Sequence, residues 1–176
     1  TYVSLTAGTS HTCGLDLEGV ATCVGGGADV PLDTPPEDTF FETISAGATH
    51  TCGVLADNSV VCWGTMRSPP LLKLTSISSG DEFICGDTPT GHPNCSGDDT
   101  FGQTSGVPKE LFLSEITTGA RHGCGITLEG SIECWGEDAD DKLDGPTTPI
   151  HSIVSGPASN HTCAIMSDPP EGDSGD

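Results

Sequence analysis

The sequence predicts an all-β protein built from a repeated four-stranded unit of the propeller-blade kind. Three observations lead to this prediction: similar windows recur along the 176 residues, cysteines recur in couples ten residues apart, and 24 glycines and 13 prolines are spread over the whole chain. Frequent glycine and proline are typical of many short strands and turns rather than long helices. The repeat is therefore the feature on which the predicted fold and function both depend.

Five units follow one another along the chain. The window ISAGATHTCGVLADNSVVCWG in the second unit resembles LTAGTSHTCGLDLEGVATCVG in the first and ITTGARHGCGITLEGSIECWG in the fourth. The first cysteines of successive units are 39, 33, 39 and 39 residues apart. Such a period suits a four-stranded propeller blade or a helical hairpin repeat, and the alternation of β-branched with polar residues argues against helices.

The repeats are expected at residues 4–42, 43–74, 75–114, 115–151 and, incomplete, 152–166. About four and a half repeats would form a partial or small ring within a single domain, 1–166. The remaining residues, 167–176, are acidic and rich in glycine and proline, so they are expected to form a flexible tail.

Each of the first four units has a turn signal between its two cysteines, such as Leu128-Glu129-Gly130 in the fourth. This pattern predicts a β-hairpin whose cysteines lie on facing strands, with Cα atoms about 4.5 to 5.5 Å apart and within disulfide range. Closing each loop would stabilise the fold by about 2.5 to 3 kcal/mol. The predicted disulfides are Cys13–Cys23, Cys52–Cys62, Cys85–Cys95 and Cys124–Cys134.

The number of cysteines bears on location and on metal binding. Nine cysteines in a chain of this length are unusual in the cytosol and ordinary in a secreted protein, which predicts an extracellular or cell-surface location. Their ten-residue spacing does not match the short spacing of zinc ligands. Cys163 has no partner in register, so we expect either an intermolecular bridge or a free thiol in a truncated segment.

The repeated pattern I-S-A-G-x-x-H-T-C-x-L, followed by a turn and V-x-C-W-G, resembles the regulator of chromosome condensation (RCC1) repeat. More narrowly, it is similar to secreted, cysteine-bearing bacterial and environmental variants. The stretch Cys95-Ser96-Gly97-Asp98-Asp99-Thr100-Phe101-Gly102-Gln103 is similar to the family's W-G-x-N-x-x-G-Q-L-G, with Ser96 in the tryptophan position. The resemblance covers nearly the whole chain and implies a β-propeller, usually of seven blades.

The chain departs from the seven-bladed pattern because it has too few repeats and the fifth lacks its second cysteine. Three explanations stay open: a longer parent protein, a smaller or open ring, or a neighbouring molecule that supplies the missing strands. An incomplete blade exposes backbone groups that can pair with another chain. The hypothesis is head-to-tail association with other copies, which gives filaments where the contacts do not close into a ring; the alternative is a truncated segment.

The formal charge of -21, with only five lysine and arginine residues, argues against nucleic-acid binding and against anionic membranes. No apolar run is long enough to span a bilayer. The acidic surface would keep the protein in solution and admit cationic partners or divalent ions.

The histidine before the first cysteine recurs as His11, His50, His122 and His161. A residue that repeats in every blade is expected to serve each blade, here by hydrogen bonding to a neighbouring blade or turn, whereas a catalytic histidine would occur once. Trp63 and Trp135 recur likewise and are expected to pack between blades.

Two further kinds of site are weaker predictions. No cofactor is expected, but Asp138, Asp140, Asp141 and Asp144 are calcium candidates in an acidic loop that does not fit the EF-hand pattern. Asn94 and Asn160 fit the glycosylation sequon. Asn160 is the better candidate because it lies in a two-residue insertion expected to protrude.

The sequence contains no Gly-x-Ser-x-Gly, phosphate loop, HExxH or unique Ser/His/Asp set, so we expect a non-enzymatic protein. Two functions are predicted: a structural subunit that self-associates through the incomplete terminal blade, or an adhesion or inhibitor module. The second would bind an extracellular protein or glycan through the inter-blade loops 24–42, 65–74, 96–114 and 136–151.

Overall fold

A computed structural model describes residues 1–26, 34–69, 71–138 and 149–166. In these ranges all regular structure is β-strand, arranged as four three-stranded antiparallel sheets and one two-stranded sheet. The first two sheets contain β1 (Tyr2–Ala7), β2 (His11–Asp16) and β3 (Ala21–Gly25), then β4 (Thr43–Ala46), β5 (His50–Val54) and β6 (Val60–Gly64). The third and fourth contain β7 (Ser78–Ser79), β8 (Phe83–Asp87) and β9 (Pro93–Gly97), then β10 (Leu113–Thr118), β11 (His122–Thr127) and β12 (Ile132–Gly136). The fifth contains β13 (Ile150–Val154) and β14 (Cys163–Met166).

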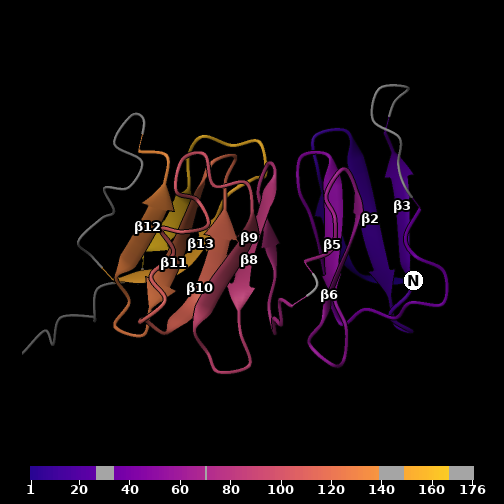
Figure 1. Cartoon of the computed structure of the whole chain (residues 1–176), viewed down its shortest axis with the longest axis horizontal. Helices are drawn as coiled ribbons and strands as arrows, with labels where there is room; N and C mark the ends of the chain where they lie inside the picture. Colours follow the sequence, from indigo (N-terminus) through magenta and orange to yellow (C-terminus); the bar gives the residue numbers. More distant parts are fainter. Residues whose placement is uncertain (27–33, 70, 139–148, 167–176) are drawn as a thin grey trace, which may run out of the picture.

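The sheets follow one another across the molecule in sequence order, from the indigo first sheet to the orange fourth sheet in Figure 1. Contacts between sheets join each sheet to the next, chiefly through the first strands β1, β4, β7, β10 and β13. The arrangement is that of successive propeller blades in an open arc. The predicted all-β, propeller-like fold is confirmed, and the ring is not closed.

All four predicted disulfides are present, and each joins the second and third strands of its sheet. The paired cysteines are direct register partners, and their Cα atoms are 4.0 to 4.1 Å apart, closer than the sequence predicted. Gly19 and Gly130 close two of these hairpins with φ of +81° and +82°, a conformation that glycine adopts without steric cost.

The sheets have three strands, so the prediction of four-stranded blades is wrong for the described residues. The third unit shows the reason. After β9, the Asp99 carboxylate accepts hydrogen bonds from the backbone N–H groups of Thr104 and Ser105 at 2.9 and 2.8 Å. These donors are therefore unavailable to a fourth strand, and residues 100–106 form turns and a bend. In the second unit only an isolated bridge, Ser59 to Lys73, stands in the place of a fourth strand.

The hydrophobic core consists of four separate layers, each lying between two successive sheets. The layer between the first two sheets contains Cys13, Leu15, Ile44 and Trp63, and Phe41 packs against Trp63 with ring centroids 5.2 Å apart. Stability therefore comes from sheet-on-sheet contacts that repeat along the arc, as expected for repeat proteins.

Within the described ranges no helix has the length and apolar character needed to cross a membrane. The predicted tail, 167–176, lies outside the described residues.

Candidate functional site

The faces by which the sheets contact each other are the candidate site, because they recur inside the molecule and are left open at its two ends. Each inner sheet uses one face towards the preceding sheet and the opposite face towards the following one. Leu15 and Cys13 belong to the following-side face of the first sheet, and Ile44 and Trp63 to the preceding-side face of the second. Between the third and fourth sheets the equivalent residues, Cys85 and Trp135, again share one cluster.

Polar contacts also repeat at each junction of two sheets. A hydroxyl on the first strand of one sheet accepts a hydrogen bond from a backbone N–H on the first strand of the next sheet. The four such contacts are Ala46 N to Thr6 Oγ1 (2.8 Å), Ser79 N to Ser45 Oγ (3.0 Å), Thr118 N to Ser78 Oγ (3.0 Å) and Ser155 N to Thr117 Oγ1 (2.9 Å). The hydroxyl seven residues before the first cysteine thus fixes the register between neighbouring sheets.

The recurring histidines contact the next sheet, as predicted, at two of the junctions. His11 Nε2 is 2.9 Å from Thr51 Oγ1, and His122 Nε2 is 2.9 Å from Thr162 Oγ1. In each case the threonine stands directly before the first cysteine of the next unit. Burial lowers the pKa of His11, so the buried ring is held neutral and can pair with a hydroxyl.

His50 differs from these histidines because the third unit has Ile84 in the threonine position. Neither ring nitrogen of His50 has a hydrogen-bond partner, and the side chain is 1% exposed. Burial first, and then the nearby His11, lower the pKa of His50 to about 4. The junction of the second and third sheets therefore lacks the histidine–threonine hydrogen bond found at the first and fourth junctions.

The first sheet exposes the face that inner sheets bury against a preceding sheet. Tyr2, Leu5 and Val24 are 52%, 69% and 65% exposed. At the same repeat positions in the second sheet, Phe41, Ile44 and Trp63 are only 4%, 5% and 6% exposed. These residues of the first sheet are still apolar although no described part of the chain covers them.

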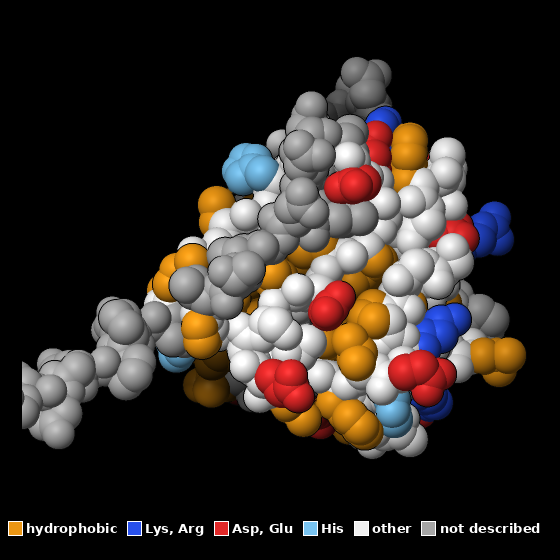
Figure 2. All heavy atoms as spheres, turned by 90° about the vertical axis from the view of Figure 1, so that its left-hand side faces the viewer, with side chains coloured by type: hydrophobic (Ala, Val, Ile, Leu, Met, Phe, Trp, Pro, Cys, Tyr) orange, Lys and Arg blue, Asp and Glu red, His pale blue; other side chains and the backbone are white. Residues whose placement is uncertain are grey.

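The fifth sheet exposes the opposite face, the one that inner sheets bury against a following sheet. Ile165 is 63% exposed, whereas Leu15, at the same repeat position of the first sheet, is 3% exposed. Cys163, Val154 and Met166 are exposed as well. Figure 2 views the molecule from the side of the later sheets and shows hydrophobic side chains at the surface with acidic side chains among them.

The other candidate residues fall in three groups. Cys163 is a free, exposed cysteine. Asn160 is exposed on the connection between β13 and β14, and Asn94 is partly buried in β9. Of the calcium candidates only Asp138 lies within the described residues, since Asp140, Asp141 and Asp144 fall outside them; the described part of the chain holds no group of three or more potential metal ligands.

Trp63 and Trp135 lie between sheets, as the sequence predicted. Trp135 also donates a hydrogen bond from Nε1 to the backbone oxygen of Gln103 at 3.0 Å. Gln103 was not among the predicted site residues. The sequence feature that could have indicated it is the Gly102-Gln103 pair of the repeat motif. In the structure this pair lies in a loop that folds back against the next sheet.

Comparisons with known proteins agree with this geometry. The family model described as "Regulator of chromosome condensation (RCC1) repeat" matches residues 41–68. Comparison with curated proteins gives no match. The chain is thus similar to RCC1 repeat proteins, and each of its four three-stranded sheets carries a disulfide.

Two plant ectodomains are similar in structure and sequence. The CRINKLY WD40 ectodomain of the Arabidopsis thaliana receptor kinase ACR4 aligns with a TM-score of 0.81 and 29% identity over 94% of this chain and 65% of that one. The entire ectodomain of the Physcomitrella patens receptor kinase CR4 aligns with a TM-score of 0.82 and 32% identity over 95% of this chain and 50% of that one. The chain therefore spans 65% and 50% of these two relatives.

Yeast RCC1 (Prp20), whose structure was solved bound to Kap60, is similar in fold with a TM-score of 0.69. It is 16% identical over 96% of this chain and 55% of that one. This likeness concerns the fold alone.

Proposed function

We propose that this chain is a non-enzymatic, extracellular protein-binding module that associates end to end with other copies of itself. Its four disulfides and its similarity to two receptor-kinase ectodomains support the extracellular location. The observation that carries the self-association is that both end sheets keep apolar side chains at positions that form sheet-to-sheet contacts inside the molecule.

The exposed face of the first sheet has the character of a contact surface. Terminal repeats of a soluble array carry a polar outer face when they act as caps. Here Tyr2, Leu5 and Val24 are apolar and more than half exposed, and a contiguous apolar patch on a surface is typical of an interaction site. Burying each of these side chains would contribute about 1.5 to 3 kcal/mol before the cost of association.

The two end faces complement each other. Inside the chain, the position of Ile165 in one sheet packs against the position of Leu5 in the next, as Leu15 and Ile44 do in the first layer. The last sheet of one copy can therefore dock on the first sheet of another in the geometry already used within the chain. His161 would then face Thr12, in the relation that His11 has to Thr51.

The proposed contact lacks one polar bond of the internal junctions. Val154 stands in the place of the hydroxyl that accepts a backbone N–H from the next sheet. The docked ends would consequently bind more weakly than two successive sheets of one chain. Because the two faces differ, the contact is head-to-tail, and repeating it extends the arc into a larger ring or a filament.

Cys163 supports a different contact. Every other cysteine is in a disulfide, so the partner that a second copy can offer is its own Cys163. This bridge would join two copies tail to tail and cover both last sheets, which opposes head-to-tail growth. Oxidation of Cys163 is therefore expected to limit the assembly to pairs.

Sedimentation velocity over a range of protein concentrations, with reductant for Cys163, tests the proposal. We expect wild-type protein to associate reversibly, and either Leu5→Asp or Ile165→Asp to weaken association by about tenfold or more. Leu17→Asp is the matched control, since Leu17 is an exposed leucine in the turn between β2 and β3, outside the strands that form the end face. Wild-type protein that stays monomeric at every concentration would contradict the self-association.

A second function, recognition of another extracellular protein through the inter-blade loops, is favoured by an open pocket between the second and third sheets.

A further inference from the structure

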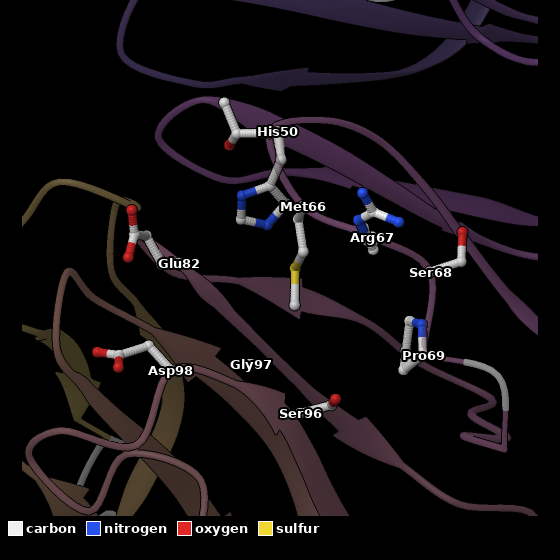
Figure 3. A pocket seen from close by; sticks show the side chains of 10 residues that line it. His50, Met66, Arg67, Ser68, Pro69, Glu82, Ser96, Gly97 and Asp98 are labelled. Atoms are coloured by element: carbon white, nitrogen blue, oxygen red, sulfur yellow. The ribbon is translucent and has the colours of Figure 1, made fainter.

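A pocket of about 470 Å³ opens between the second and third sheets. This volume lies in the range of pockets that hold small ligands or side chains. Its walls include Met66, Arg67 and Pro69 from the loop after β6, and Glu82 and Asp98 from the third sheet. His50 lies at its base, and Figure 3 shows the imidazole beside the Met66 side chain and Glu82 and Asp98 together on one side.

The equivalent groove between the third and fourth sheets is filled by the chain itself. The loop after β9 folds into it, so that Gln103 is buried and its backbone oxygen accepts the Trp135 Nε1 hydrogen bond. In the same groove, the Arg121 guanidinium lies 4.7 Å from the Phe101 ring centroid and pairs with Glu137 at 3.6 Å. This filled groove shows which groups the open pocket lacks: a loop that covers it and a cation that pairs with its carboxylate.

Three differences in sequence leave the pocket open. The spacing from Cys52 to Cys85 is 33 residues rather than 39, so the loop after β6 is too short to fill the groove. Ser96 replaces the tryptophan found at Trp135. Ile84 replaces the threonine that would bond the buried histidine, and His50 is left without a partner.

The charge at the rim also differs between the two grooves. Glu82 stands at the position of Arg121, and Asp98 at the position of Glu137. The backbone hydrogen bond between the two positions is the same in both grooves. The Asp98 N–H donates to the Glu82 oxygen, and the Glu137 N–H donates to the Arg121 oxygen, both at 2.9 Å. A pair of opposite charges in the filled groove is thus replaced by two carboxylates in the open one.

We propose that the pocket between the second and third sheets binds a lysine or arginine side chain of a protein partner, with Glu82 as its main counter-charge. The partner supplies the cation that Arg121 supplies in the filled groove. Met66 and Pro69 contact the alkyl part of the inserted side chain, and Met66 adapts readily because its side chain is unbranched and flexible.

The two carboxylates have different parts in this site. Asp98 accepts hydrogen bonds from Thr100 and from Gln103 Nε2, the latter at 2.7 Å, so its side chain is held towards its own loop. The Thr100 hydroxyl lowers the pKa of Asp98, which keeps it charged. Glu82 is exposed and makes no ion pair with any residue of the described ranges, so it is free to pair with a ligand.

Arg67 is the opposing charge of the pocket. It lies on the wall formed by the loop after β6, away from Glu82 in Figure 3. Its charge disfavours an incoming cation, so its removal should strengthen binding. This gives the proposal a prediction of opposite sign to that for Glu82.

The pocket lies in the middle of the arc, away from both end faces. The proposal rests on the proposed role in binding extracellular proteins but not on self-association. Titrations in the Leu5→Asp/Ile165→Asp background, in which the end faces are disabled, therefore separate the two ideas.

The test uses NMR titration of the ¹⁵N-labelled protein with capped tripeptides of the form acetyl-Gly-X-Gly-amide. With X as lysine or arginine, we expect saturable shifts of the amide signals of Glu82 and Gly97, and about tenfold weaker binding with X as glutamine. Glu82→Gln should weaken binding about tenfold, and Glu82→Arg, which copies the filled groove, should abolish it. Arg67→Gln should strengthen it.

Glu18→Gln is the control, because it makes the same charge change at an exposed hairpin tip of the first sheet. An unchanged pattern of the remaining amide signals shows that each variant is folded. The proposal is overturned if the glutamine peptide binds as well as the lysine peptide, if Glu82→Arg binds like wild type, or if no peptide produces saturable shifts at the pocket.

Discussion

Replacing His50 by phenylalanine should reduce the dependence of stability on acidic pH. In the folded chain His50 is buried and neutral, with a pKa lowered from 6.5 to about 4 by burial and by His11. The unfolded chain takes up the proton near pH 6.5. Below that pH the unfolded state binds more protons than the folded state, so stability falls as the pH decreases from 6.5 to about 4.

The size of this effect follows from the difference between the two pKa values. It corresponds to a loss of about 3 kcal/mol across the whole window, of which about 2 kcal/mol should be lost by pH 4.5. Phenylalanine is a suitable replacement because Phe83 occupies the same position in the third sheet and is fully buried there.

The assay is urea-induced unfolding of the disulfide-bonded protein at pH 7 and pH 4.5. The difference in unfolding free energy between the two pH values should be about 2 kcal/mol smaller in His50→Phe than in wild type. His151→Phe, at an exposed position of β13, is the control for removing a histidine. An equal pH dependence in wild type and His50→Phe would refute the reasoning, because it would mean that His50 is not held neutral by folding.

Further predictions concern the contacts that repeat between sheets. Thr51→Val should lower the free energy of urea unfolding by about 1 to 3 kcal/mol, since it leaves a buried ring nitrogen of His11 without its partner. Thr12→Val, the same change at an end face, should lower it by less than about 0.5 kcal/mol. Gly47→Ala should lower stability by about 2 kcal/mol or more. The new Cβ would lie 2.2 Å from the His50 ring and 2.6 Å from the backbone oxygen of Gly80. Gly156→Ala, whose Cβ would have its nearest neighbour at 3.9 Å, should be close to neutral in the same assay. Cys163→Ser should abolish the covalent dimer on a non-reducing gel after oxidation.

The disulfides and the packing role of the recurring residues could be predicted from the sequence because they depend on local spacing. A turn midway between Cys124 and Cys134 places the two residues opposite each other whatever the rest of the chain does. The same reasoning identified the role of His11, since a residue that recurs from unit to unit is expected to contact the neighbouring unit.

Features that depend on the exceptions to the repeat could not be predicted in this way. The six-residue shortening before Cys85, and the changes at Ser96 and Ile84, are visible in the sequence. They identify a pocket only once the loop after β9 is seen to fill the neighbouring groove with Gln103. The strand number of the third unit was missed for a similar reason, because the Asp99 side chain takes backbone donors that a fourth strand would need there.

The most direct test of the account mixes the two end-face variants. Leu5→Asp keeps an intact last sheet and Ile165→Asp keeps an intact first sheet. Each variant alone should therefore associate about tenfold or more weakly than wild type, while an equal mixture should form a one-to-one dimer. Sedimentation of each variant and of the mixture, with reductant present, measures this. A mixture that stays monomeric, or a single variant that associates like wild type, would contradict the claim that the two exposed end faces are the complementary halves of one sheet-to-sheet contact.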